Sequence, residues 1–95
     1  MTVVVSQSGE LDIATIDGLM ERLSPHRRPG CHVVLDLRGV ELMDCLSLGQ
    51  LLAAHADSAA EGWSLSVRVE TPAVLRLLEL TKTAHLLPLE LPAAA

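Results

Sequence analysis

The hydrophobic period of this 95-residue chain changes repeatedly between the spacing of strands and that of helices. Residues 2–6 are rich in β-branched side chains, and residues 33–37 form a nearly continuous apolar run, which is typical of a strand covered on both faces. Residues 65–69 alternate between apolar and polar side chains. Strands that alternate with helical segments predict an α/β layer with right-handed crossovers and a partly parallel sheet.

Three segments carry the period of an amphipathic helix. The first begins at Asp12, whose carboxylate is placed to cap its first turn, and it ends before Pro25. Its expected apolar face carries Ile13, Ile16, Leu19, Met20 and Leu23. The second follows Asp44 and stops near Gly62. The third begins at Thr71, an N-cap residue that precedes a proline at the first helical position. These three helices are expected to pack on the sheet.

Two short segments complete the predicted sheet. Residues 10–11 follow a turn signal at residues 7–9, and they form either a short second strand or an extension of the first. Residues 86–91 are expected to form a short last strand, before a tail at residues 92–95. The sequence therefore predicts an α/β domain with a mixed sheet of four to five strands and three main helices.

Charge and aromatic content argue against several classes of function. The chain has 7 Lys and Arg against 12 Asp and Glu, a net charge of −5, and it has no Phe, no Tyr and one Trp. Nucleic-acid binders carry a basic surface, so no nucleic-acid partner is expected. No apolar run could cross a bilayer, and the N-terminus lacks the basic start of a signal peptide. We therefore expect a cytoplasmic protein without membrane insertion.

The sequence offers no pattern of metal ligands or cofactor contacts. Its histidines are scattered, and no pair has the spacing of a known metal motif. No glycine-rich phosphate-binding motif is present either. Cys31 and Cys45 are expected to remain reduced, because the chain has no export signal. No metal, cofactor or catalytic group is therefore predicted.

One junction combines features of a binding site. At residues 44–49 the connection from the central strand turns into the second helix, whose unpaired backbone N–H groups could accommodate an anion such as a phosphate ester. The helical period places Ser47 on the polar side, within reach of a partner, and Cys45 nearer the apolar side. Simpler roles stay open: Cys45 as a small residue that fills space, and Ser47 as a first-turn hydroxyl with local hydrogen bonds.

Four segments of this chain, in this order, resemble the STAS domain, in particular bacterial anti-sigma factor antagonists. They are residues 9–12 (GELD), 33–37 (VVLDL), 43–49 (MDCLSLG) and 71–74 (TPAV). The resemblance runs from the first strand to Pro88, so residues 1–91 are expected to form one STAS-like domain. It implies a non-catalytic interaction module that binds an anti-sigma factor and so regulates transcription.

The resemblance also implies a switch, from which this sequence departs. In such families the partner is commonly a serine kinase that phosphorylates a serine directly after an aspartate, in a motif resembling Asp-Ser-Ser-Gly-Leu. The phosphate adds about −1.5 to −2 charges and breaks the complex. Here Asp44 is kept, whereas Cys45, Leu46 and Ser47 replace the two serines and the glycine. The resemblance therefore predicts a docking surface that has lost its usual phosphorylation switch.

The predicted partner surface has seven residues: Asp12, Asp44, Cys45, Leu46, Ser47, Leu48 and Gly49. Asp12 matches an acidic family position that can face a basic group on the kinase, although it could simply cap a helix. Ser47 is a candidate substitute phosphorylation site. Two further functions stay open: a STAS scaffold or small cytosolic subunit of a lipid-transport ATPase complex, and a thiol-based redox protein that uses Cys45. The sequence also leaves weak self-association open.

Overall fold

The structure, a computed structural model, describes residues 1–90 as a parallel sheet with helices on one face. The strands are β1 (Thr2–Leu11), β2 (His32–Met43), β3 (Ser64–Arg68) and β4 (Leu89–Glu90). The helices are α1 (Ile16–Leu23), the 3-10 helix η1 (Ser24–His26), α2 (Cys45–Glu61) and α3 (Pro72–Leu80). The strand order is β1-β2-β3-β4, and every neighbouring pair is parallel.

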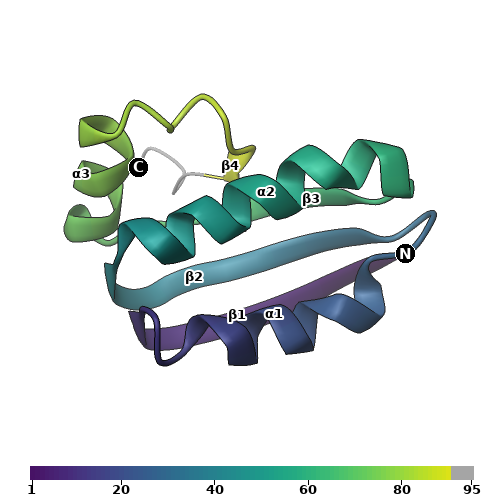
Figure 1. The fold of residues 1–95 in the computed structure, drawn as a ribbon, viewed down its shortest axis with the longest axis horizontal. Coiled ribbons are helices and arrows are strands. Elements are labelled where there is room, and N and C mark those ends of the chain that lie inside the picture. Colours follow the sequence, from purple (N-terminus) through teal and green to yellow (C-terminus); the bar gives the residue numbers. More distant parts are fainter. Residues whose placement is uncertain (91–95) are drawn as a thin grey trace, which may run out of the picture.

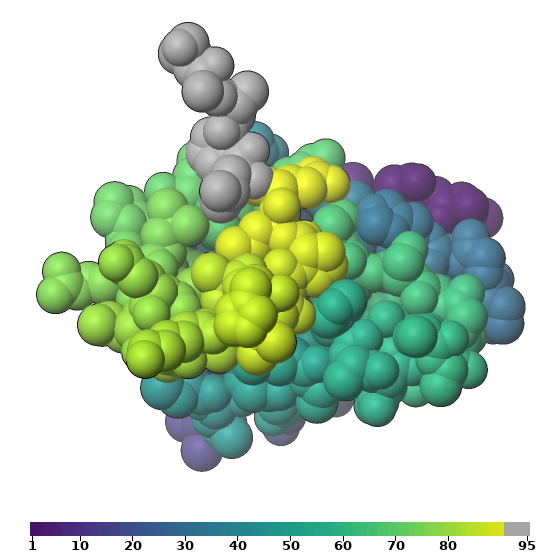
Figure 2. All heavy atoms as spheres, turned by 90° about the horizontal axis from the view of Figure 1, so that it is seen from above, coloured from purple at the N-terminus to yellow at the C-terminus, as the bar shows by residue number. Residues whose placement is uncertain are grey.

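The strand order puts the connecting helices on a common side. Right-handed crossovers that always advance to the next strand return on the same face of the sheet. Figure 1 shows α1 and α2 in front of the sheet, with α3 beyond one end of it. Seen from above in Figure 2, the segment that joins α3 to β4 lies between α3 and α2. Leu87, which is buried, anchors that segment.

The hydrophobic core lies between this face of the sheet and the helices. The largest fully buried side chains come from all of these layers: Leu11, Ile16, Leu19, Leu23, Leu35, Leu37, Leu51, Leu78, Val33, Val40, Val67 and Val69. Burying one such side chain contributes roughly 1.5–3 kcal/mol. Residues 33, 35 and 37 of β2 point toward the helices, and β2 is central because it pairs with β1 on one side and with β3 on the other.

The prediction of a mixed sheet is wrong, since the described strands are all parallel. The turn signal at residues 7–9 does not reverse the chain. It makes β-bulges, with register shifts between Ser6 and Ser8 and between Gly9 and Glu10. Gly9 has φ +79°, which a glycine adopts without strain. Glu10 and Leu11 therefore extend β1 and do not form a separate strand, so the alternative of an extension is confirmed.

Strand β2 is longer than the apolar run that predicted it. Residues 38–43, expected as a connection, continue the strand because they pair with the second half of β1, as in Gly9↔Val40 and Leu11↔Met43. Gly39 permits this approach: a Cβ there would lie 3.1 Å from the Cβ of Ser8. Pairing with a neighbouring strand therefore overrides the local loop signal.

The first helix begins later than predicted. Helix α1 starts at Ile16, and residues 12–15 form a turn in which Asp12 Oδ1 accepts from Ala14 N–H at 2.9 Å. The Asp12 N–H donates to Thr15 Oγ1 at 3.0 Å. Asp12 thus caps this turn and not the helix, because its short side chain competes for nearby backbone groups. Ile13, assigned by its spacing to the buried face, is 75% exposed.

The other helix ends follow the sequence more closely. Asp44 and Gly62 are the caps of α2, and Gly62 has φ +79°. Thr71 is the N-cap residue of α3, but its hydroxyl donates to Arg38 O at 3.4 Å and makes no cap bond. Of the last predicted strand, Leu89–Glu90 is formed. Leu91 and the tail at 92–95 lie outside the described residues. None of the helices within residues 1–90 could cross a membrane.

Candidate functional site

Asp44 ties the junction between β2 and α2 to the end of β1. Its Oδ1 accepts from Ser47 N–H at 2.8 Å, and its Oδ2 accepts from Ile13 N–H at 3.2 Å. The Asp44 N–H donates to Leu11 O at 3.0 Å. The hydrogen bond from the Ser47 backbone is the main cause that lowers the pKa of Asp44, and the Ser47 side chain and the Ile13 N–H add to it. Asp44 therefore stays ionised and joins three segments.

Ser47 is buried, which overturns the prediction that a partner could reach it. Because Asp44 is the N-cap, Ser47 falls at the third helical position and its side chain is 0% exposed. It shares the buried face of α2 with Leu51, Ala54 and Ser58, at spacings of four, three and four residues. Its Oγ has no hydrogen-bond partner among the described residues. As folded, the candidate phosphorylation site is closed to a kinase.

Cys45 and Leu46 lie at the surface. Cys45 is an exposed free thiol, so the prediction that it lies nearer the apolar side, or fills space, is wrong; Cys31 is buried and also free. Leu46 is 49% exposed. Leu48 is buried in the core and Gly49 is exposed on the first turn of α2. Of the seven predicted residues, Asp12, Asp44, Cys45, Leu46 and Gly49 therefore retain some exposure.

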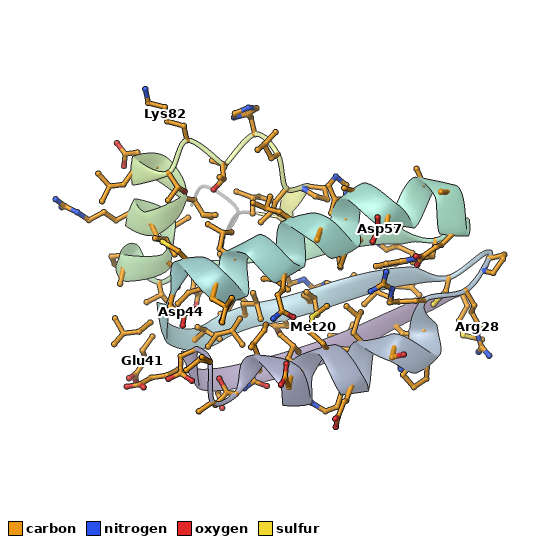
Figure 3. The ribbon with its side chains drawn as sticks, in the orientation of Figure 1. Met20, Arg28, Glu41, Asp44, Asp57 and Lys82 are labelled. Atoms are coloured by element: carbon orange, nitrogen blue, oxygen red, sulfur yellow. The ribbon has the colours of Figure 1, made fainter. Side chains whose placement is uncertain are left out.

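Apolar side chains are exposed at the same end of the molecule, next to carboxylates. Ile13 is 75% exposed and Leu42 is 55% exposed. A hollow of about 310 Å³ lies here, lined by Glu10, Leu11, Asp12, Leu42, Met43 and Asp44. Figure 3 shows Glu41 and Asp44 at this end, where β2 leads into α2. We call Glu10, Asp12, Ile13, Glu41, Leu42, Asp44, Cys45 and Leu46 together the acidic docking surface.

Sequence reasoning missed four members of the acidic docking surface: Glu10, Ile13, Glu41 and Leu42. Helical spacing had assigned Ile13 to the core, and Leu42 lay in a stretch expected to be a connection. The sequence did carry a signal for the two apolar residues: Ile13 directly follows Asp12, and Leu42 directly follows Glu41. Only the parallel pairing of β1 and β2 brings the two acidic segments side by side.

The chemistry of this surface fits a partner that is both basic and apolar. Within residues 1–90 no group of three or more His, Cys, Asp and Glu side chains could hold a metal ion. The exposed apolar side chains offer area for burial, and the carboxylates surround them with negative charge. Such a combination favours protein docking, in which the apolar centre supplies affinity and the charges supply orientation.

Comparison with known proteins agrees with the fold. The structure is a singly wound parallel α/β domain, and residues 1–88 match the family described as "Mlab, STAS domain". The chain therefore belongs to the STAS domain family. This confirms the resemblance seen in the four sequence segments.

Two relatives are similar over most of the chain. An anti-sigma F factor antagonist of Paenibacillus polymyxa is 30% identical over 89 residues, which are 92% of this chain and 76% of that protein. The crystal structure of a Thermotoga maritima protein, described as a candidate anti-sigma factor antagonist, superposes with a TM-score of 0.77. That match has 18% identity and covers 97% of this chain and 80% of the other, so it shows the fold alone.

Proposed function

We propose that this protein is a non-catalytic, cytoplasmic anti-sigma factor antagonist that binds an anti-sigma factor of the serine kinase type and thereby regulates transcription. The observation that carries this proposal is the acidic docking surface, where Ile13, Leu42 and Leu46 are exposed around the capped start of α2. The similarity to the Paenibacillus polymyxa antagonist supports the choice of partner. Burying the three apolar side chains against the partner supplies the affinity, as the apolar centre does in other protein interfaces.

We further propose that binding is not switched off by serine phosphorylation at the start of α2. Cys45 stands at the phosphoacceptor position of the family motif, and a serine kinase forms no phosphoserine there. Ser47 does not replace it, because its hydroxyl is buried against the sheet side of α2. The complex should therefore persist in the presence of ATP, unlike that of a relative with the complete motif.

Binding to the anti-sigma factors of the same genome, measured by calorimetry, tests the docking surface. Leu46→Asp should weaken binding by at least about tenfold, since a carboxylate then replaces a buried apolar contact. Leu80→Asp is the matched control: Leu80 is 69% exposed and is the last residue of α3, outside the acidic docking surface as defined above. Equal losses for both variants, or no binding to any of the anti-sigma factors, would contradict the proposal.

A charge reversal tests whether the carboxylates of the acidic docking surface speed up association with the partner. Glu41→Lys should slow association and flatten its dependence on salt, because Glu41 is an exposed carboxylate beside Leu42. Glu21→Lys, an exposed carboxylate on α1, is the control for net charge. If both reversals slow association equally, overall charge and not the acidic docking surface guides the partner.

The lost switch has its own test. Cys45→Ser restores a hydroxyl at an exposed position, so incubation with the cognate kinase and ATP should label this variant at residue 45. The unchanged protein should remain unlabelled, as judged by mass spectrometry. Label on Ser47 of the unchanged protein would show that the start of α2 opens enough to serve as a substrate.

A second candidate is the STAS scaffold or small subunit of a lipid-transport ATPase complex. The observation that favours it is the absence of the phosphoacceptor serine, since a permanent subunit needs no such switch. The match to the family described as "Mlab, STAS domain" is compatible with it. Copurification from the native cell decides between the two functions. An anti-sigma factor bound at the acidic docking surface supports the first, and an ATPase subunit bound there supports the second.

A further inference from the structure

Strand β1 is an open edge of the sheet. Within residues 1–90 its backbone pairs with β2 alone, although β1 is ten residues long. Figure 1 shows it along the outer side of the sheet, behind α1. A long edge strand presents a row of backbone donors and acceptors, which natural proteins usually cover, shorten or protect with charge.

The register shows which backbone groups face outward. The Met1 carbonyl accepts from His32 N–H at 2.7 Å, so before the first register shift, which follows Ser6, the odd-numbered residues direct their backbone polar groups toward β2. Because these directions alternate along a strand, Thr2, Val4 and Ser6 point theirs to the open side. The contact of Arg22 Nη1 with Ser6 O, at 2.7 Å, lies on that outer side as expected.

The outward stretch has little of the protection that edges usually carry. Residues 2–9 contain no charged side chain and no proline, and Val4 is 52% exposed on the face of the sheet opposite the helices. Arg22 covers one carbonyl, that of Ser6, and a carbonyl oxygen has a second lone pair for another donor. The groups at Thr2 and Val4 stay available.

We propose that β1 pairs antiparallel with β1 of a second copy of this chain, with Val4 on the twofold axis. In this register Val4 faces Val4 of the second copy as a hydrogen-bonded pair, and Thr2 faces its Ser6. The arrangement is closed, since each copy offers the same segment to the other. It continues the four-stranded sheet across the axis.

The uncharged stretch at residues 2–9 is where a second copy meets the least electrostatic repulsion. Each chain carries a net charge of −5, and two such molecules approach at least cost through a neutral segment. The antiparallel register also sends the acidic ends of β1 in opposite directions. Glu10 lies six residues from the axis, so two copies hold these carboxylates roughly 40 Å apart at about 3.4 Å per residue.

The proposed pairing leaves the acidic docking surface free and does not depend on the proposed function. That surface lies beyond Leu11, at the far end of β1 from Val4. The dimer would be weak, because one strand pair buries less than the roughly 1,000 Å² of a stable interface. More salt should strengthen it by screening the like charges of the two copies.

Sedimentation equilibrium on the full chain tests the pairing. The mean mass should rise with concentration from 10.1 kDa toward twice that value. Val4→Pro should hold the protein monomeric, since it removes the outward N–H at the centre of the interface and no bond to β2. Val4→Thr keeps both the N–H and the β-branched shape, and it should dimerise. Circular dichroism verifies that both variants fold.

Cysteine cross-linking tests the register without relying on a proline variant. In a Cys45→Ser background, Val4→Cys should form a disulfide-linked dimer under mild oxidation, because a hydrogen-bonded pair holds its Cα atoms about 5.5 Å apart. Ser6→Cys is the matched control on the same strand and face. Its two copies would lie roughly 14 Å apart, which is too far for a disulfide. Mixing Thr2→Cys with Ser6→Cys should restore the cross-link.

Three results would overturn the proposal. The first is a constant mass of 10.1 kDa at up to millimolar protein. The second is an unchanged dimer in folded Val4→Pro, which would place the interface elsewhere. The third is cross-linking of Ser6→Cys alone as efficient as that of Val4→Cys, which would show contact without this register.

Discussion

The two faces of the sheet are covered differently: helices pack on one face, and polar side chains cover the other. On β2, the side chains of Val33, Leu35 and Leu37 are 0% exposed beneath the helices. The residues between them face the side that carries no helix among residues 1–90, although a parallel sheet normally has both faces covered. There, polar side chains bonded to one another take the place of a second layer of helices.

The contacts on this open face form a chain across three strands. His32 Nε2 lies 2.9 Å from Ser66 Oγ, and Ser66 Oγ donates to Glu90 Oε1 at 3.2 Å. Arg68 Nε donates to Glu90 Oε2 at 2.9 Å. These contacts tie the two-residue strand β4 to the sheet and lower the pKa of Glu90, with Arg68 as the main cause.

A pair of buried serines makes the contrast plain. Ser66, on the open face, is 6% exposed and has two side-chain partners. Ser47, under the helix that carries it, is 0% exposed, and its hydroxyl is unpaired among the described residues. Ser66 thus finds its partners on neighbouring strands of the open face, whereas Ser47 has none in the first turn of α2. Ser58, further along the same face of α2, satisfies its hydroxyl within the helix by donating to His55 O.

The largest effect should come from the covered face. Leu35→Ala should lower the free energy of unfolding by about 2–5 kcal/mol, because it leaves a cavity between the sheet and the helices. Its neighbour Val34 points to the open face and is 4% exposed. Val34→Ala, which removes fewer carbons on a face that carries no helix among residues 1–90, should cost clearly less. Urea unfolding measures both, and equal losses would break the comparison.

Ser66→Ala should be the next largest change. It removes two hydrogen bonds of the open face, and it should lower the free energy of unfolding by about 1–2 kcal/mol. Hydrogen exchange at Leu89 and Glu90 should also speed up, since β4 loses one of its side-chain contacts. Unaltered exchange would mean that Arg68 and the backbone pairing with β3 hold the strand without Ser66.

Ser47→Ala should stabilise the protein, whereas Leu35→Ala and Ser66→Ala destabilise it. Removing a buried hydroxyl that lacks a partner should raise the free energy of unfolding by about 1 kcal/mol. Thermal unfolding beside Ser66→Ala checks this difference in sign. A destabilised Ser47→Ala would show that the hydroxyl has a partner in solution, such as a bound water.

The smallest effect is a dependence of stability on pH, which comes from the pair of Asp36 and Arg38 on β2. Arg38 Nη2 lies 2.7 Å from Asp36 Oδ2, and this side-chain hydrogen bond is the main cause that lowers the pKa of Asp36 from 3.8 to about 2. The depressed pKa stabilises the fold above pH 4, and this contribution is lost as pH falls toward 2. Asp36→Asn should flatten that part of the stability profile.

Much of the fold follows from local sequence. The caps of α2, Asp44 and Gly62, were predictable because each acts on backbone groups within a few residues. The apolar run at 33–37 identified the central strand for the same reason. Asp12 shows the limit of local reasoning, since capping a turn and capping a helix use the same side chain and similar spacing.

The candidate site could be predicted only in part. Cys45 and Leu46 were found from the motif, and both are exposed. The burial of Ser47 depends on the rotation of α2, which Asp44 sets by joining the helix to β1. Leu42 could not be found, because its strand forms only through pairing with β1.

By itself, the sequence determined the order of the elements, the second helix with its caps, and the loss of the phosphoacceptor serine at Cys45. These features depend on periodicity and on contacts between near neighbours along the chain. The tertiary structure decided that the strands run parallel, that Ser47 is buried, and that Glu10 and Leu42 lie on one surface. Such features depend on which strands pair, and many strand pairings share the same pattern of apolar residues.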